Sequence, residues 1–152
     1  MADYGLLKTL HVLGAILLVG NVTVTGVWAL YLYRQRAQVP FRPVARAILW
    51  TDLFFTLCGG AMLTVTGVLL IRRTGLPWLE TPWLLRGIGG LVGSTLLWLA
   101  VLLPDQWRME RLRAGDEAGL RRLFLRWSVV GWTATGLLYW SVWQMVGKGL
   151  GG

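Results

Sequence analysis

One histidine, His11, is the side chain in this sequence best suited to hold a metal or a haem. A neutral imidazole can ligate haem iron, copper or zinc, and it can also relay a proton. The alternative is structural, with the ring hydrogen-bonded to a hydroxyl or a carbonyl on a neighbouring helix. Two-histidine ligation would need a second copy of the chain, and the weaker candidates for another ligand are Met62 and Met145. The sequence therefore leaves a haem b group open as one cofactor.

Asp52 is the second residue with chemistry to offer, because it lies one turn inside a long apolar run. A carboxylate in hydrocarbon is costly unless it is paired or reaches water. We expect an ion pair with Arg46 or Arg126 at the membrane interface, or a role in a proton or solute path. Such a path would have to link Asp52 to His11, and the polar steps available for it are Asn21, Thr25, Thr56 and Cys58. The polar face of the predicted bundle comprises Asn21, Thr25, Asp52, Thr56 and Thr64.

Motifs of the common enzyme classes are absent from the sequence. It contains no nucleophile triad, paired carboxylates, phosphate-binding loop or cluster of metal-ligating residues. The single cysteine, Cys58, lies in an apolar run, so no disulfide forms within the chain, and we expect a small core residue there. The pattern leaves enzymatic activity undecided and does not favour it.

The elements that carry these residues are long apolar segments. The chain has 152 residues, of which 55% are hydrophobic and 14% charged, whereas soluble domains carry about 25% charge. About 20 apolar residues suffice to cross a bilayer as a helix. We predict an all-α polytopic membrane protein, in which one domain of residues 1–152 forms an up-and-down bundle of four transmembrane helices. The predicted spans are residues 6–33, 47–71, 83–103 and 127–146, with a charged loop at 105–126.

Small and polar residues recur at steps of three and four in the first span, which places them on one stripe of the helix. This stripe should face other helices, since polar groups are costly against lipid. It comprises His11, Gly14, Leu18, Asn21, Thr25 and Trp28. Between the spans, Pro40 and Pro43 predict a loop, and Pro104 predicts the exit of the third span. A turn is expected at residues 114–115, between two helical extensions.

Basic residues predict the orientation of the chain. Ten of the fifteen Lys and Arg residues flank the first and third loops, and such loops usually stay in the cytoplasm. Both termini then face outward from a bacterial inner membrane. The net charge of +8 follows from these flanks, which meet anionic lipid headgroups, so we expect no nucleic-acid partner.

Four short motifs resemble a known family. Residues 7–15 read LKTLHVLGA, residues 82–84 read PWL, residues 102–104 read LLP before Gln106 and Met109, and residues 145–146 read MV before Lys148. Their order and spacing resemble the domain of unknown function 2269 family of predicted bacterial membrane proteins. Gly149 stands where that family tends to have proline. The resemblance implies a four-span fold and no established activity.

A more distant likeness concerns the Lys-x-x-His opening at residues 8–11. It is similar to the start of HemJ-type protoporphyrinogen oxidases and of the copper-resistance D membrane family. The first likeness implies a haem ligand at His11. The oxidases also use a lysine deeper in the bundle, and the later spans of this chain contain no internal lysine.

Three functions from different classes follow from these observations. The first is a membrane protein that binds haem or a metal through His11, as a homodimer. The second is a cofactor-free scaffold or accessory subunit of a larger membrane complex. The third is a small-solute or proton transporter in which Asn21 and Asp52 line the path.

Overall fold

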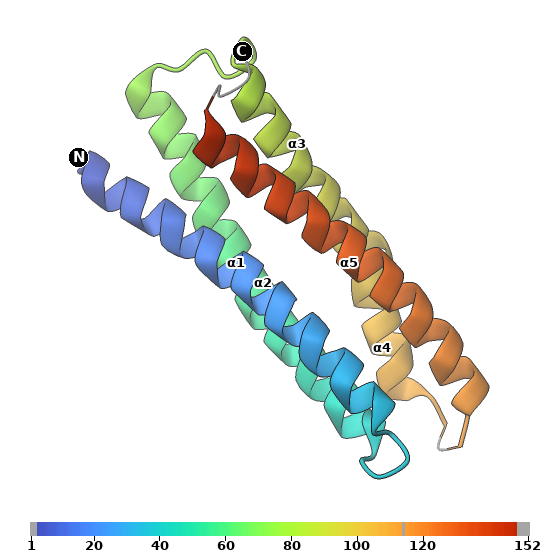
Figure 1. Cartoon of the computed structure of the whole chain (residues 1–152). Helices are drawn as coiled ribbons and strands as arrows, with labels where there is room; N and C mark the ends of the chain where they lie inside the picture. Colours follow the sequence, from blue (N-terminus) through green and yellow to red (C-terminus); the bar gives the residue numbers. More distant parts are fainter. Residues whose placement is uncertain (1–2, 114, 149–152) are drawn as a thin grey trace.

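Four helical rods, running alternately up and down, make up the protein in the computed structural model, which describes residues 3–113 and 115–148 (Figure 1). The third rod is continuous through a π-helical turn. No strand occurs in the described ranges, so the predicted all-α fold is confirmed. The elements are α1 (Tyr4–Arg34), α2 (Phe41–Thr74), α3 (Pro82–Leu97), η1 (Trp98–Leu102), α4 (Leu103–Arg111) and α5 (Glu117–Gly147).

Three of the rods are long and apolar enough to cross a membrane: α1, α2 and the continuous helix Pro82–Arg111. Their outer faces carry many exposed apolar side chains, such as Ile16, Phe54 and Leu96. In water such surfaces would associate, whereas lipid tails are a natural solvent for them. A membrane crossing by α5 stays a prediction.

The residues at the helix ends explain where α2 stops and where α5 starts. Gly75, at φ 63°, ends α2 in the left-handed conformation that glycine adopts readily. Gly115, at φ 91°, makes the turn before α5, as expected, while its neighbour in the predicted turn, residue 114, lies outside the described residues. Asp116 then caps α5 by accepting a hydrogen bond from the backbone N–H of Gly119.

One expectation about proline was wrong. Helix α2 already begins at Phe41, so Pro43 lies in its first turn, where a missing N–H leaves no intrahelical bond unmade. The helical extension expected beyond Pro104 is present. The wider π-helical turn η1 directly precedes α4, and such a turn accommodates the proline ring and the missing donor. The helix therefore continues to Arg111.

The rods pack as two hairpins, the first formed by α1 and α2 and the second by α3, η1 and α4 with α5 (Figure 1). Gly14 and Gly59 let the backbones of α1 and α2 touch, and Gly90 does the same for α3 against α5. The hairpins join each other through α2 with α4 and α1 with α5. Among the described residues, no Cα atom of α2 lies within 8 Å of a Cα atom of α3, so these two helices are further apart than the other neighbours.

Aromatic side chains hold the hairpins together at the end where the first and third loops lie. Tyr33 stacks on Phe124 with ring centroids 3.8 Å apart, and Phe41 meets Phe124 edge-on. Trp98 and Trp127 extend this buried cluster toward the middle of the molecule. The core therefore lies at one end, and the middle of the molecule is left less filled.

Candidate functional site

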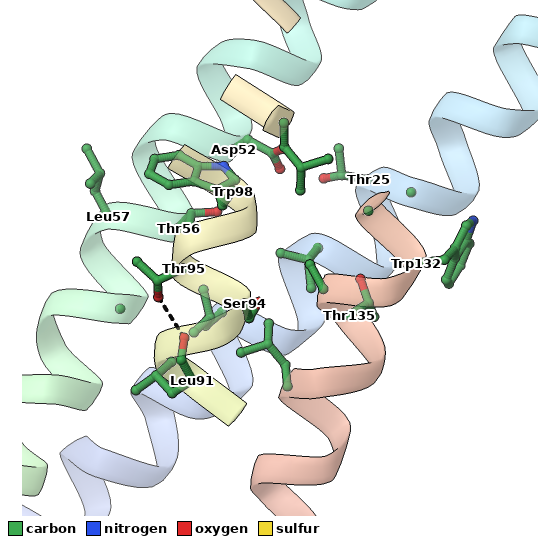
Figure 2. A pocket seen from close by; sticks show the side chains of 18 of the residues that line it. Thr25, Asp52, Thr56, Leu57, Leu91, Ser94, Thr95, Trp98, Trp132 and Thr135 are labelled. Atoms are coloured by element: carbon green, nitrogen blue, oxygen red, sulfur yellow. Dashed lines mark hydrogen bonds between the residues drawn. The ribbon is translucent and has the colours of Figure 1, made fainter. Parts of the chain in front are cut away.

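A cavity of about 420 Å³ lies between the two hairpins. All four rods contribute to its wall, which is mostly apolar with hydroxyl groups distributed along it (Figure 2). Of the predicted polar face, four of the five residues line the cavity: Thr25, Asp52, Thr56 and Thr64. Further hydroxyls come from Ser94, Thr95, Ser128 and Thr135.

Asp52 is 5% exposed and is held by two amide side chains. Asn21 donates from Nδ2 to Oδ1 over 3.1 Å, and Gln106 donates from Nε2 to Oδ2 over 2.6 Å. Thr25 in turn donates to the Asn21 carbonyl oxygen over 3.3 Å. Both carboxylate oxygens are therefore hydrogen-bonded, but the amides are neutral and leave the charge uncompensated.

The expected ion pair between Asp52 and Arg46 or Arg126 was wrong. Arg46 lies 3.7 Å from Glu110, and Arg126 binds both oxygens of Asp105, with its Nε 2.8 Å from Oδ2. Asp105 is fully buried, so it offers the arginine a stronger partner than a carboxylate already holding two amides. Hydrogen bonding to Asp105, followed by its charge, raises the pKa of Arg126 above its usual value.

Sequence reasoning missed the roles of Asp105 and Gln106, although a signal was present. Leu102, Gln106 and Met109 follow steps of four and three, which place them on one face of a helix. All three are buried, together with Asp105. The expectation that Pro104 ends the span hid this pattern, because residues beyond it were assigned to a charged loop.

Four buried polar atoms have no hydrogen-bond partner within the described residues. Three belong to side chains on the cavity wall: Thr56 Oγ1, Trp98 Nε1 and Trp127 Nε1. The two indoles are each only 7% exposed. Figure 2 draws Asp52, Thr56 and Trp98 at one end of the cavity. The three atoms themselves have almost no accessible surface, so they lie within the packed wall and do not face the cavity.

His11 lies outside this cavity, in the contact between α1 and α2. Its Nδ1 is 3.0 Å from the Leu63 carbonyl and 3.1 Å from Thr66 Oγ1. Because Thr66 already donates to the Met62 carbonyl, the ring nitrogen is the donor in this arrangement. The imidazole fills the space beside Gly67, where a Cβ would lie 3.1 Å from Cε1. The glycine thus serves close packing in this chain.

The structure separates one of the two methionines from His11, and Met62 stays a candidate ligand. Met62 supplies its backbone carbonyl to Thr66, and Met145 packs against Gly87 between α3 and α5, in the other hairpin. No group of three His, Cys, Asp or Glu side chains suited to a metal occurs in residues 3–113 and 115–148.

Two smaller expectations were also wrong. Trp28 is 55% exposed, and Ala29, the next residue, is the buried member of the α1 stripe. The step of four residues from Thr25 to Ala29 keeps the stripe on the buried face, whereas the step of three to Trp28 does not. Gly14, Leu18 and Thr25 are buried as expected. Cys58 is exposed on the outer face of α2 and is not a core residue.

Comparison with known proteins gives one family. The model of a family described as "Predicted integral membrane protein (DUF2269)" matches residues 5–149. Neither the curated proteins nor the solved structures compared contain a match. The likeness to the haem-handling and copper families therefore stays a prediction.

Proposed function

Since the chain belongs to the DUF2269 family of predicted integral membrane proteins, we propose that it binds a small solute in the cavity between its hairpins, as a membrane transporter does. The observation that carries this proposal is the cavity between the hairpins, whose mostly apolar wall includes Asp52 and several hydroxyl groups. An ionisable side chain within a membrane protein is costly and marks a ligand or ion path by default.

The route by which a solute enters would be lateral. In the described residues no Cα atoms of α2 and α3 come within 8 Å of each other, and exposed side chains of α2 such as Leu57 and Val65 line the cavity. A solute partly dissolved in the membrane could pass between these helices without unfolding either hairpin. While the solute passes, the two hairpins would stay in contact at the end where the first and third loops lie.

The test fills the cavity from a position that tolerates a side chain. Gly60 lines the cavity, and a Cβ there would meet nothing within 4 Å. Gly60→Leu should therefore fold and occupy the binding space. The matched control is Gly20→Leu, because a Cβ at Gly20 also meets nothing within 4 Å and this glycine does not line the cavity.

Thermal unfolding in detergent would be followed with three aromatic probes: benzoylcholine, its uncharged isostere 3,3-dimethylbutyl benzoate, and the anion hippurate. A probe present at about 100 times its Kd stabilises the folded state by about 2.7 kcal/mol. At least one probe should raise the Tm of wild type and Gly20→Leu by several degrees and leave Gly60→Leu unchanged. If none does so, the solute-binding proposal fails and the scaffold alternative gains support.

A second candidate function is haem or metal binding at His11, in a homodimer that supplies the other ligand. The observation in its favour is the anchoring of Nδ1 by the Leu63 carbonyl, since metal-ligating histidines commonly fix their second nitrogen in this way. The test is an absorption spectrum of the purified protein, oxidised and then reduced, with metal analysis. A Soret band that shifts on reduction and is lost in His11→Phe would support this function, and a colourless, metal-free wild type would remove it.

A further inference from the structure

We propose that the protein binds an anionic phospholipid in a groove beside α4, with the lipid phosphate on two arginines and an acyl chain along leucine side chains. The groove has a volume of about 730 Å³. None of the described residues lines both this groove and the cavity between the hairpins. The lipid site is therefore independent of the proposed solute-binding function, and either can fail without the other.

One face of the third rod forms much of the groove. Leu99, Leu103, Trp107 and Arg111 follow steps of four in the sequence, so they lie on one side of the helix in this order, and all four line the groove. Leu123 of α5 adds a further apolar side chain. The lining thus changes along the rod from apolar to aromatic to basic.

This order matches the layers of a lipid bilayer. The continuous helix Pro82–Arg111 is long and apolar enough to cross a membrane. About 20 residues of helix suffice to cross the hydrocarbon, so a crossing that starts at Trp83 ends near Leu103. Trp107 and Arg111 then lie about one and two turns further out, at the depth of the headgroups, where tryptophan is favoured.

Two arginines at the polar end of the groove can bind a phosphate group. Arg111 is exposed and forms no hydrogen bond or ion pair within residues 3–113 and 115–148. The side chain of Arg108 is 62% exposed and makes a 3.4 Å contact with Asp105, which is also bound through both oxygens by Arg126. Guanidinium groups match the oxygens of a phosphate with paired N–H donors.

No carboxylate opposes an anion in this groove. Its lining contains no acidic residue in the part of the chain that the structure describes. The two acidic residues of α4 are engaged elsewhere, because Asp105 is fully buried against Arg126 and Glu110 lies 3.7 Å from Arg46. Basic pockets at the ends of membrane helices favour anionic lipid headgroups, and the apolar lining below this one suits an acyl chain.

The experiment measures lipid binding to the full chain in a neutral detergent by native mass spectrometry. The two probes are dioleoyl phosphatidylglycerol and dioleoyl phosphatidylcholine, which share their acyl chains. Phosphatidylglycerol should bind at least about fivefold more tightly, since each basic side chain near an anionic membrane surface contributes about 1 kcal/mol. This comparison uses wild-type protein and needs no variant.

A matched pair of variants locates the site. Arg111→Gln removes a side chain without partners in the described residues, so it should fold and bind phosphatidylglycerol about fivefold more weakly. The control is Arg113→Gln, because Arg113 is also exposed and does not line the groove. Its affinity should equal that of wild type, and so should that of Gly60→Leu, which fills the other cavity.

Three results would overturn the proposal. Equal affinities for the two lipids would remove the role of the arginines. Equal losses in Arg111→Gln and Arg113→Gln would show that the lipid associates with the basic surface as a whole. Displacement of phosphatidylglycerol by an equal concentration of sn-glycerol 3-phosphate, which has no acyl chain, would identify a site for soluble phosphates in place of a lipid site.

Discussion

Gln106 donates a hydrogen bond of 2.6 Å from Nε2 to Asp52 Oδ2, and this bond joins α4 to α2 across the two hairpins. Gln106 is 1% exposed and Asp52 is 5% exposed, so water cannot replace either partner. The same carboxylate binds Asn21 on α1. Three rods thus meet at one carboxylate, which places it at the end of the cavity and fixes how the hairpins are joined.

Replacing Gln106 with Leu should destabilise the protein, because it removes the donor and leaves one carboxylate oxygen without a partner. A buried hydrogen bond to a charged group contributes about 1.5–3 kcal/mol, so the free energy of unfolding should fall by this amount. It can be measured by titration with sodium dodecyl sulfate in mixed micelles. Gln38→Leu is the control, since Gln38 is exposed in the first loop. Equal effects of the two changes would contradict the role given to Gln106.

The sequence allowed part of this arrangement to be predicted. Asn21 and Thr25 lie one turn apart on the stripe of α1, and the helical period alone places them together. The partner of Asp52 was harder to predict, because Gln106 is 54 residues away along the chain. The burial of Gln106 follows from helical spacing only when residues 102–109 are taken as one helix, and their assignment to a charged loop obscured this. The pairing of Arg126 with Asp105, where a pairing with Asp52 had been expected, was missed for the same reason.

Gly14→Ala should weaken the contact between α1 and α2. The added Cβ would lie 2.8 Å from the Leu63 backbone nitrogen and 3.1 Å from the Gly59 carbonyl oxygen. Backbone atoms cannot rotate away as a side chain can, so the helices must separate, and overpacking of this kind costs about 1–3 kcal/mol. Thermal unfolding should show a lower Tm for this variant.

The control for that change is Gly20→Ala on the same helix. A Cβ at Gly20 meets nothing within 4 Å, and alanine favours a helix over glycine by about 1 kcal/mol. Its Tm should equal or exceed that of wild type. A Tm loss of the same size in both variants would show that helix packing at Gly14 is not the cause.

Arg126→Leu should destabilise the protein more than the removal of an exposed arginine does. Asp105 is fully buried, and without Arg126 its charge would keep only the 3.4 Å contact with Arg108. Breaking such a pair from one side leaves a buried charge uncompensated. Arg36→Leu is the comparison, because its partner Glu117 is exposed and exposed pairs contribute little. Similar Tm values for both variants would indicate that Asp105 reaches water or is protonated.

A crossing of the membrane by α5 can be tested through single cysteines, after Cys58 is replaced by serine. Asp3→Cys and Lys148→Cys lie next to the ends of α1 and α5, and Gln38→Cys lies in the first loop. With four spans and the first loop in the cytoplasm, an impermeant maleimide added to intact cells should label Asp3→Cys and Lys148→Cys but not Gln38→Cys. Permeabilised cells provide the control, since all three should then react.

The result at Lys148→Cys decides between two topologies, because α5 begins on the side of the first loop (Figure 1). The first three helical turns of α5 carry Arg121, Arg122 and Arg126, so its N-terminal end is polar while the remainder is rich in apolar and aromatic residues. If α5 crosses, residue 148 shares the outer side with residue 3, and the cavity is enclosed by four spans. Labelling of Lys148→Cys only together with Gln38→Cys would place α5 at the membrane surface. It would then be unable to cover the cavity within the bilayer, so the solute-binding proposal would fall with the fourth span.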